Sequence, residues 1–236
     1  MATSISIVIP TYNEAEGIQR LIRYLLSTGG GHLPEIIVSD GGSTDLTPEI
    51  AEAAGAKVVL SPVKGRAAQM NAGAAVATGE ILYFLHADTF PPPDYKEQII
   101  ASCTSACGAG CFRLQFDDAH WFLQLNAWFT RFDIDSIRFG DQSLYMLQRY
   151  FRQINGFRED LLLLEDQEII SRIRKVTGFK VLSAAVTTSA RKYLENGVYR
   201  LQCIFSFIWF LYFLGFPQQK LVNIYNRLVR RPKLKG

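Results

Sequence analysis

Short apolar runs alternate with amphipathic segments through the first half of the chain. The runs at residues 4–10, 35–39, 57–60 and 81–85 are typical of strands buried on both faces of a sheet. Apolar residues at helical spacing predict helices over residues 13–28, from 43 or 44 to about 55, and over 66–77. We expect Asn13 to cap the first helix and Ser43 or Thr44 the second. This alternation predicts an α/β fold with a doubly wound, mostly parallel sheet flanked by helices.

The second half of the chain is less regular. Its pattern predicts helices over residues 94–102, 121–132 and 165–175, and strands over 109–116, 143–147, 179–182 and 185–189. The sequence contains no internal repeat and no low-complexity linker. We therefore expect one α/β domain over residues 1–195, followed by a hydrophobic helical appendage over residues 196–236.

The appendage begins with a strongly apolar run at residues 198–216. Between Leu201 and Phe216 it holds five Phe, one Trp and one Tyr, and an amphipathic helix is predicted over residues 218–229. The run is short for a spanning helix, which needs about 20 apolar residues. A helix in the membrane interface, a dimer face and a core helix are the alternatives. Aromatic residues beside a basic tail favour membrane contact or a homodimer through these helices.

The net charge and the cysteine spacing argue against two classes of protein, those that bind nucleic acid and those that hold zinc or iron–sulfur clusters. The net charge of +3 and the pI of about 8.6 are too mild to indicate nucleic acid as a partner. The charge is uneven, because residues 227–236 hold three Arg and two Lys with no acid. The four cysteines match no zinc or iron–sulfur spacing. No secretory signal precedes the first strand, so we expect a cytoplasmic protein with reduced thiols, peripheral at the cytoplasmic face of a membrane if the appendage docks there.

Candidate ligand-binding groups follow the predicted strands at four places. They are the turn at residues 10–14, Asp40 with the glycines after it, Lys64-Gly65-Arg66 at the start of the third helix, and Asp88 after the fourth strand. Ligands bind beyond the carboxyl ends of strands in an open α/β sheet. The turn and Asp40 suit a base or ribose, the cations at a helix N-terminus suit a pyrophosphate, and Asp88 suits a divalent cation that reaches a phosphate. Each group alone is equally an ordinary turn, but together on one sheet edge they predict a site for a nucleotide diphosphate with a metal.

A carboxylate pair, Glu165 and Asp166, is the candidate for acid–base chemistry. Burial and mutual repulsion raise the pKa of one member of such a pair toward the range of a general base. The alternative is an acidic first helical turn that the helix dipole favours. A further polar cluster, Gly140, Asp141 and Gln142, is expected on the acceptor side of the same cleft.

Four of these segments together resemble the family 2 glycosyltransferases of the GT-A fold. They are IVIPTYNE (7–14), SDGGSTD (39–45), HADT (86–89) and ED (165–166), and they occur in the family's order. The resemblance covers about the first 190 residues. KGRAAQMN (64–71) and SAR (189–191) also look like a bacterial subgroup of transferases associated with radical-SAM/selenodomain proteins.

The resemblance implies a role for each matching residue. Asp166 would be the base that deprotonates the acceptor hydroxyl, with Glu165 beside it. Asp88 would bind Mg²⁺ or Mn²⁺ and, through it, the diphosphate of a nucleotide sugar. The donor-binding residues would be Pro10, Thr11, Tyr12, Glu14, Asp40, Gly41, Lys64, Arg66, Asn71, Ala87, Asp88 and Arg191.

Two departures from the family pattern refine the expected reaction. The position two before Asp88, which usually carries a second acid, holds His86, a poorer ligand for a hard cation. The Trp motif of processive members is missing after Asp166, and Arg172 and Arg174 do not replace it. We therefore expect one inverting transfer from a UDP- or GDP-sugar to a hydroxyl of a sugar or lipid-type acceptor. A nucleotidyltransferase and a non-catalytic nucleotide-sugar-binding partner protein are the alternatives.

Overall fold

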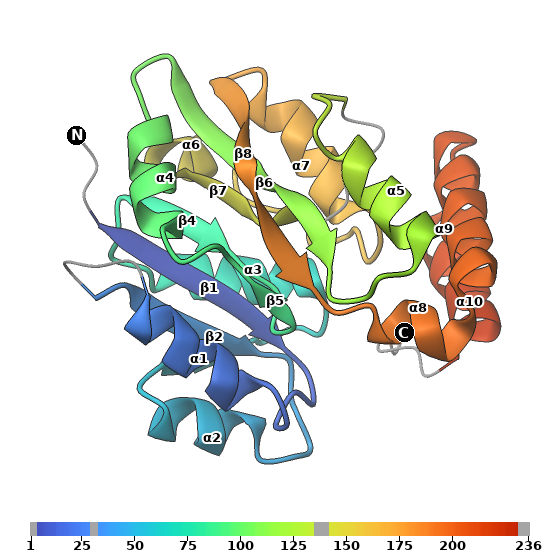
Figure 1. The fold of residues 1–236 in the computed structure, drawn as a ribbon, viewed down its shortest axis with the longest axis horizontal. Helices are drawn as coiled ribbons and strands as arrows, with labels where there is room; N and C mark the ends of the chain where they lie inside the picture. Colours follow the sequence, from blue (N-terminus) through green and yellow to red (C-terminus); the bar gives the residue numbers. More distant parts are fainter. Residues whose placement is uncertain (1–3, 29–32, 135–141, 231–236) are drawn as a thin grey trace.

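The computed structural model describes residues 4–28, 33–134 and 142–230. In this part of the chain, helices cover both faces of an eight-stranded sheet with strand order β3-β2-β1-β4-β7-β6-β8-β5 (Figure 1). The strands are β1 (Ile5–Thr11), β2 (Glu35–Asp40), β3 (Lys57–Leu60), β4 (Ile81–Phe84), β5 (Thr89–Phe90), β6 (Cys107–Phe116), β7 (Leu144–Leu147) and β8 (Gly178–Thr188). The helices are α1 (Ile18–Ser27), α2 (Thr47–Ala53), α3 (Arg66–Ala75), α4 (Tyr95–Ser102), α5 (Trp121–Phe129), α6 (Gln148–Gln153), α7 (Glu165–Ile173), α8 (Arg191–Asn196), α9 (Val198–Phe213) and α10 (Gln218–Leu228).

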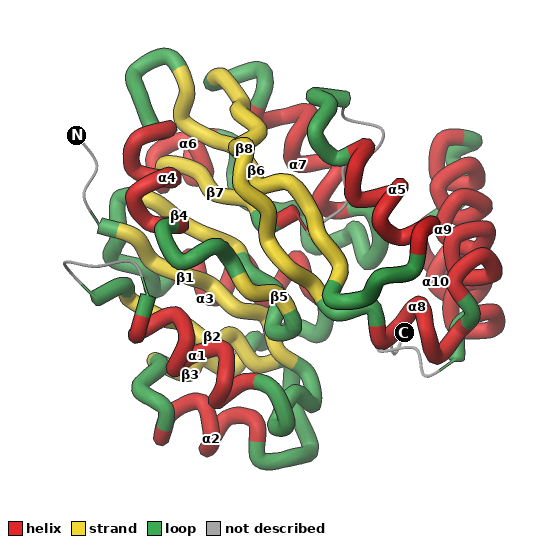
Figure 2. Tube along the Cα trace, in the orientation of Figure 1, coloured by secondary structure: helices red, strands yellow, loops and turns green. Residues whose placement is uncertain are grey.

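The predicted mostly parallel sheet is confirmed. β3, β2, β1 and β4 are parallel, as is the pair β6 and β8, whereas β7 runs antiparallel between β4 and β6. The strands form one curled layer between helices (Figure 2). Because β1, β2 and β4 are parallel, their carboxyl ends meet at one edge of the sheet.

Alternation of side chains along β1 produces two hydrophobic layers. Ile7 and Ile9 pack with α1 on one face, where α2 and α4 also lie. Val8 packs with α3 on the other face, which α6 and α7 complete. Both layers contain fully buried residues, so β1 lies in the middle of the core, as its uninterrupted apolar run predicts.

The expected helix caps at Asn13, Ser43 and Thr44 are wrong. α1 begins at Ile18 after Gly17 and α2 begins at Thr47 after Leu46, without a side-chain cap on either. Asn13 instead has a φ of +54°, accepts from the Thr44 N–H at 2.8 Å and donates its own N–H to Ser43 Oγ at 2.9 Å. These polar groups therefore join the loops after β1 and β2.

The two strands expected at residues 179–182 and 185–189 are one strand, β8. Its pairing with β6 shifts register between Cys111 and Arg113 of β6, so the strand continues through an irregularity. The sequence interpretation took this irregularity for a loop. The short elements β5, α6 and α8 were also not predicted.

The C-terminal helices α9 and α10 form a hairpin with a small apolar core of its own. Polar side chains connect this hairpin to the rest of the chain. Asn126 of α5 donates to Gln202 of α9 at 3.1 Å, and Gln218 of α10 contacts the backbone of residues 162–163. No helix among the described residues combines the length and hydrophobicity needed to cross a bilayer.

Candidate functional site

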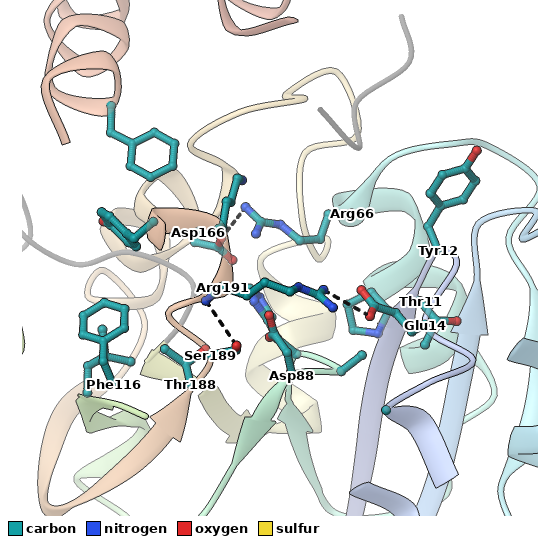
Figure 3. Close-up of a pocket in the computed structure, with 18 of the residues that line it drawn as sticks. Thr11, Tyr12, Glu14, Arg66, Asp88, Phe116, Asp166, Thr188, Ser189 and Arg191 are labelled. Carbon is teal, nitrogen blue, oxygen red and sulfur yellow. Dashed lines mark hydrogen bonds and ion pairs between the residues drawn. The ribbon is translucent and has the colours of Figure 1, made fainter. Parts of the chain in front are cut away.

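A large cleft lies at the carboxyl ends of β1, β2 and β4. Its volume is about 1840 Å³, more than the ~300–1,000 Å³ of a usual small-molecule pocket. Predicted site residues from both halves of the chain line it, namely Pro10, Thr11, Tyr12, Glu14, Gly41, Lys64, Arg66, Ala87, Asp88, Asp166 and Arg191 (Figure 3). Of the strand ends expected to converge, those with Thr11 and Asp88 line this cleft together with Asp166.

Asp40 lies behind the wall of this cleft. Its side chain is buried, and its carboxylate accepts from the N–H groups of Gly42 and Ser43 at 2.9 and 2.8 Å. It also accepts from Ser43 Oγ at 2.5 Å and from Thr11 Oγ1 at 3.1 Å. Asp40 is not among the cleft-lining residues. In this structure it shapes the loop that carries Gly41, and a direct contact with a base or ribose stays a prediction.

Gln69 is a site residue that sequence reasoning missed. Its buried side-chain amide donates to the carbonyl of Thr11 at 2.6 Å and to that of Ser39 at 3.0 Å. It thereby joins the ends of β1 and β2 from the first turns of α3. The signal that could have identified it is a Gln within an alanine-rich helix that is expected to pack on the sheet. A side-chain amide buried there needs hydrogen-bond partners.

Glu14 and Arg191 approach each other from opposite ends of the chain. Arg191 Nη2 lies 4.0 Å from Glu14 Oε2, and Arg191 is half exposed. In Figure 3 the Arg191 side chain extends toward Glu14. Arg191 lines the same cleft as Asp88, the carboxylate that is expected to bind the metal, so a diphosphate there would find positive charge.

Asp88 is half-buried beyond the end of β4. The adjacent Thr89 is buried, and its hydroxyl lies 2.9 Å from that of Thr188 at the end of β8. The antiparallel pairing of β5 with β8 holds this turn against the second half of the sheet. Asp88 consequently projects into the cleft from a turn that two strands constrain.

Arg66 connects the donor side of the cleft to the carboxylate pair. Its Nη2 lies 3.0 Å from Asp166 Oδ2, and its Nε donates to Glu165 Oε1. Figure 3 shows Arg66 and Asp166 meeting across the cleft. Arg66 was predicted as a diphosphate ligand, and the structure adds that it also holds the candidate base.

Glu165 and Asp166 occupy different environments in the first turn of α7. Glu165 is 1% exposed and does not line the cleft, whereas Asp166 does. Burial raises the pKa of Glu165, the Arg66 guanidinium opposes this shift, and the neighbouring Asp166 charge adds to it. Leu164, in the left-handed region with φ of +65°, turns the chain into the helix before these acids. Asp166 therefore lines the cleft, while the buried Glu165 contacts Arg66.

Two predicted site residues lie away from the cleft. Asn71 was predicted to bind the donor, but its amide donates to the Phe157 carbonyl at 2.9 Å and accepts from the Phe157 N–H at 2.9 Å, so it fastens a loop. Gln142 was predicted on the acceptor side, but it is buried and donates to the carbonyls of Phe112 and Thr130. Both amides satisfy backbone groups, which competes with ligand binding. The predicted Gly140 and Asp141 lie outside the described residues.

The C-terminal hairpin closes the far end of the cleft, which the sequence did not reveal. Phe205, Trp209 and Phe210 of α9 line it. The Trp209 indole N–H donates to Gln167 Oε1 at 3.2 Å, one residue after the candidate base. The apolar run was interpreted as an appendage, but these three side chains border the cleft.

The chemistry of the donor set fits a divalent cation held jointly with a ligand. Among residues 4–28, 33–134 and 142–230, no group of three or more His, Cys, Asp and Glu could hold a metal by itself. Mg²⁺ commonly takes one or two protein carboxylates and completes its shell with waters and substrate phosphates. Asp88 provides one hard oxygen ligand in the cleft, so a diphosphate would supply further ligands.

Comparison with known proteins places these residues in a family context. The model of Glycosyl transferase family 2 matches residues 6–159, more than half of the chain. Glucosyl-3-phosphoglycerate synthase of Mycolicibacterium smegmatis is 35% identical over 97 residues, 38% of this chain and 32% of that protein. Undecaprenyl-phosphate 4-deoxy-4-formamido-L-arabinose transferase of Klebsiella pneumoniae is 32% identical over 106 residues, 41% of this chain and 32% of that protein. The matches thus span about a third of the length of these curated relatives.

Solved structures with similar folds include complexes with nucleotides. The mannosyltransferase PcManGT from Pyrobaculum calidifontis, in complex with GDP-Man and Mn²⁺, has a TM-score of 0.71 at 17% identity, covering 97% of this chain and 70% of that one. S. aureus TarS 1-349 in complex with UDP has a TM-score of 0.67 at 19% identity, covering 79% of this chain and 60% of that one. At these identities the likeness shows the fold, and the predicted GT-A fold is confirmed.

Proposed function

Because the chain belongs to glycosyl transferase family 2, we propose that it transfers a sugar from a UDP- or GDP-sugar to an acceptor hydroxyl in a single inverting step. One observation carries this proposal: Asp88, the cations Arg66 and Arg191, and Asp166 line the same cleft. A ligand that spans this cleft could contact a diphosphate-binding group at one end and a base at the other.

The donor would bind on the side formed by the first half of the sheet. Thr11, Tyr12, Glu14 and Asp40 would contact the base and ribose, as the family resemblance implies. Asp88 would hold Mg²⁺ or Mn²⁺, which supplies positive charge to the diphosphate of the departing nucleotide. Complexes of PcManGT with GDP-Man and Mn²⁺, and of TarS with UDP, support a nucleotide and a divalent cation at such a site.

Asp166 would act as the general base. It takes the proton of the acceptor hydroxyl while that oxygen bonds to the anomeric carbon. The bond from the anomeric carbon to the diphosphate oxygen breaks, and its electron pair leaves with the nucleotide diphosphate. Arg66 is placed to neutralise charge on this leaving group and to orient Asp166, because it already contacts the Asp166 carboxylate.

A single transfer agrees with the surroundings of α7. Arg172 pairs with Glu168 and donates to the carbonyls of Ile154 and Gly156, and Arg174 pairs with Asp133. Neither arginine lines the cleft. On the segments at 64–71 and 189–191 we also place the chain in the subgroup associated with radical-SAM/selenodomain proteins, which stays a prediction.

A nucleotide panel tests this function. Thermal unfolding is measured with UDP-, GDP-, CDP- and dTDP-sugars and with nucleoside triphosphates, each with and without Mn²⁺. We expect one diphosphate sugar to raise the melting temperature only when Mn²⁺ is present, and Asp88→Asn to remove the metal-dependent part of that shift. Asp94→Asn, at the start of α4, is the control.

The panel also separates the alternatives. A shift by triphosphates alone would favour a nucleotidyltransferase. Slow release of nucleotide from the bound sugar would identify an enzyme, whereas binding without any hydrolysis would indicate a nucleotide-sugar sensor. An equal shift for the parent protein and Asp88→Asn would contradict the metal site.

A further inference from the structure

α5 and α9 lie beside each other on the side of the molecule away from α1 and α2 (Figure 1). Asn126 of α5 donates to Gln202 of α9 at 3.1 Å. At the start of α5, the Phe122 ring lies 5.2 Å from that of Tyr199, centroid to centroid. The two helices therefore touch near the start of α9, and each also has an exposed outer surface.

These outer surfaces expose large apolar side chains, which we call the α5–α9 face. It consists of Leu125 and Trp128 on α5 and of Phe207, Phe210, Phe213 and Leu214 on and directly after α9, all at least 41% exposed. The four positions on the α9 side repeat at helical spacing and form one stripe. A soluble protein seldom leaves such an apolar patch to water, so the face is expected to contact a partner.

The inner side of α9 is equally apolar. Ile204, Ile208 and Leu211 are buried against α10, so α9 is hydrophobic around most of its circumference. A helix with a single buried stripe carries polar residues on its opposite side. The exposed side of α9 is apolar instead. Packing in the core of the hairpin does not explain these exposed apolar residues.

The chain segment that forms the helical hairpin carries charge of one sign. From residue 196 to residue 230 the chain carries Arg200, Lys220, Arg227 and Arg230 and no acid, and residues 231–236 add one Arg and two Lys. On α5, the Arg131 guanidinium lies 4.5 Å from the centre of the Trp128 ring. Asp133, the acid after α5, is already paired with Arg174. Aromatic side chains beside basic residues suit the headgroup region of an anionic bilayer.

We propose that the α5–α9 face docks on an anionic lipid surface. The aromatic and leucine side chains would enter the headgroup region, and the basic residues of the hairpin would contact lipid phosphates. A second copy of this chain fits less well, because a two-fold interface would bring the same basic residues toward each other. Phe210 also lines the cleft, so docking would bring that end of the cleft to the lipid surface.

Flotation of the full-length protein with vesicles tests the proposal. We expect binding to phosphatidylcholine vesicles that contain phosphatidylglycerol and much weaker binding to phosphatidylcholine alone. Phe207→Glu combined with Leu214→Glu should lower the affinity for the mixed vesicles on the order of tenfold or more, because two apolar contacts are lost. Leu33→Glu, at a residue 71% exposed before β2, is the matched control and should float like the parent protein.

Charge reversal provides a second test. Lys220→Glu with Arg227→Glu should weaken binding to phosphatidylglycerol vesicles and should bring it close to the level seen with phosphatidylcholine alone. Unchanged far-ultraviolet circular dichroism and melting temperature would establish that these variants fold. Failure of the parent protein to float, or equal flotation of the Phe207 and Leu214 variant, would overturn the proposal.

Two further outcomes are distinguishable. If light scattering shows a dimer that Phe207→Glu with Leu214→Glu dissociates, the face is an interface between copies and the lipid proposal is wrong. Nucleotide binding is measured separately, so a protein that floats without binding any nucleotide sugar would contradict the proposed function and leave lipid docking supported.

Discussion

At the scale of single residues, the division of roles between Glu165 and Asp166 depends on burial. Glu165 is withdrawn from the cleft and contacts Arg66, whereas Asp166 lines the cleft and shares the same arginine. Burial raises the pKa of Glu165, so ionising it in the folded protein depends on Arg66. In the proposed mechanism, adjacent acids in one helical turn would thus provide a reactive group and a positioning group.

Asp166→Asn tests the assignment of the base. The amide cannot accept the acceptor proton, so we expect the rate of nucleotide release from the donor to fall about 10²- to 10⁴-fold. Donor affinity should change far less than this rate, because Asp88 is untouched and Arg66 keeps its hydrogen bond to Glu165. Nucleotide release is measured under saturating donor with Mn²⁺, and donor affinity is measured by calorimetry.

Asp160→Asn is the control for this substitution, since Asp160 is exposed, pairs with Arg158 and does not line the cleft. It should retain the turnover of the parent protein. Near-normal turnover of Asp166→Asn would exclude the base assignment while leaving the donor site intact.

At the scale of elements, α3 sets the geometry of the donor side. Gly73 packs against β1 so closely that a Cβ atom at this position would collide with Val8 Cγ1. This close packing brings the start of α3 to the strand ends, where Gln69 joins β1 to β2 and Arg66 reaches α7. The alanine-rich composition of α3 serves the same close approach.

Gly73→Ala should therefore destabilise the protein. Alanine gains up to about 1 kcal/mol in helix propensity, but overpacking a core typically costs about 1–3 kcal/mol. We expect a net loss of about 1 kcal/mol in the free energy of unfolding, measured with urea. Ala75→Ser, at an exposed position of the same helix, should stay within about 0.5 kcal/mol. A stabilised Gly73→Ala protein would show that α3 can move away from β1 without cost.

At the scale of the whole molecule, the C-terminal hairpin completes the cleft. Gln218 of α10 accepts from the N–H groups of Leu162 and Leu163 at 3.3 and 3.2 Å, in the loop before the carboxylate pair. The loop between α6 and α7 is thus held by a contact with a helix more than 50 residues later in the chain. Removing this contact should make the position of Asp166 less fixed and should leave the predicted donor-binding residues in place.

Gln218→Ala should lower kcat by about tenfold with donor affinity unchanged, because small displacements of a catalytic group have large effects on rate. Nucleotide release and calorimetry provide the two measurements. The exposed neighbour Gln219 supplies the control Gln219→Ala, for which we expect no change in either quantity. Identical kcat values for the two variants would mean that the hairpin does not position the base.

The hydrophobic pattern of the sequence was sufficient to predict those elements whose structure depends on local rules. The strands at residues 4–10, 35–39, 57–60 and 81–85 correspond to β1 to β4. Continuous apolar runs predict β1, β2 and β4 because these parallel strands are buried, whereas β3 is a partly exposed edge strand. The caps at Asn13, Ser43 and Thr44 failed, because these side chains bond across two loops. Asn71 and Gln142 likewise bond to backbone groups far away in the sequence and do not line the cleft, and their roles as ligand-binding residues stay predictions.

The sequence by itself determined the succession of strands and helices and the placement of Thr11 and Asp88 at one sheet edge. Both follow from side-chain periodicity and from the common direction of parallel strands, which are local properties. Only the tertiary structure decided that Asp40 is enclosed by its own loop, that Arg66 joins Glu165 and Asp166, and that α9 borders the cleft. These contacts depend on packing between segments far apart in the chain, and no periodicity within either segment encodes them.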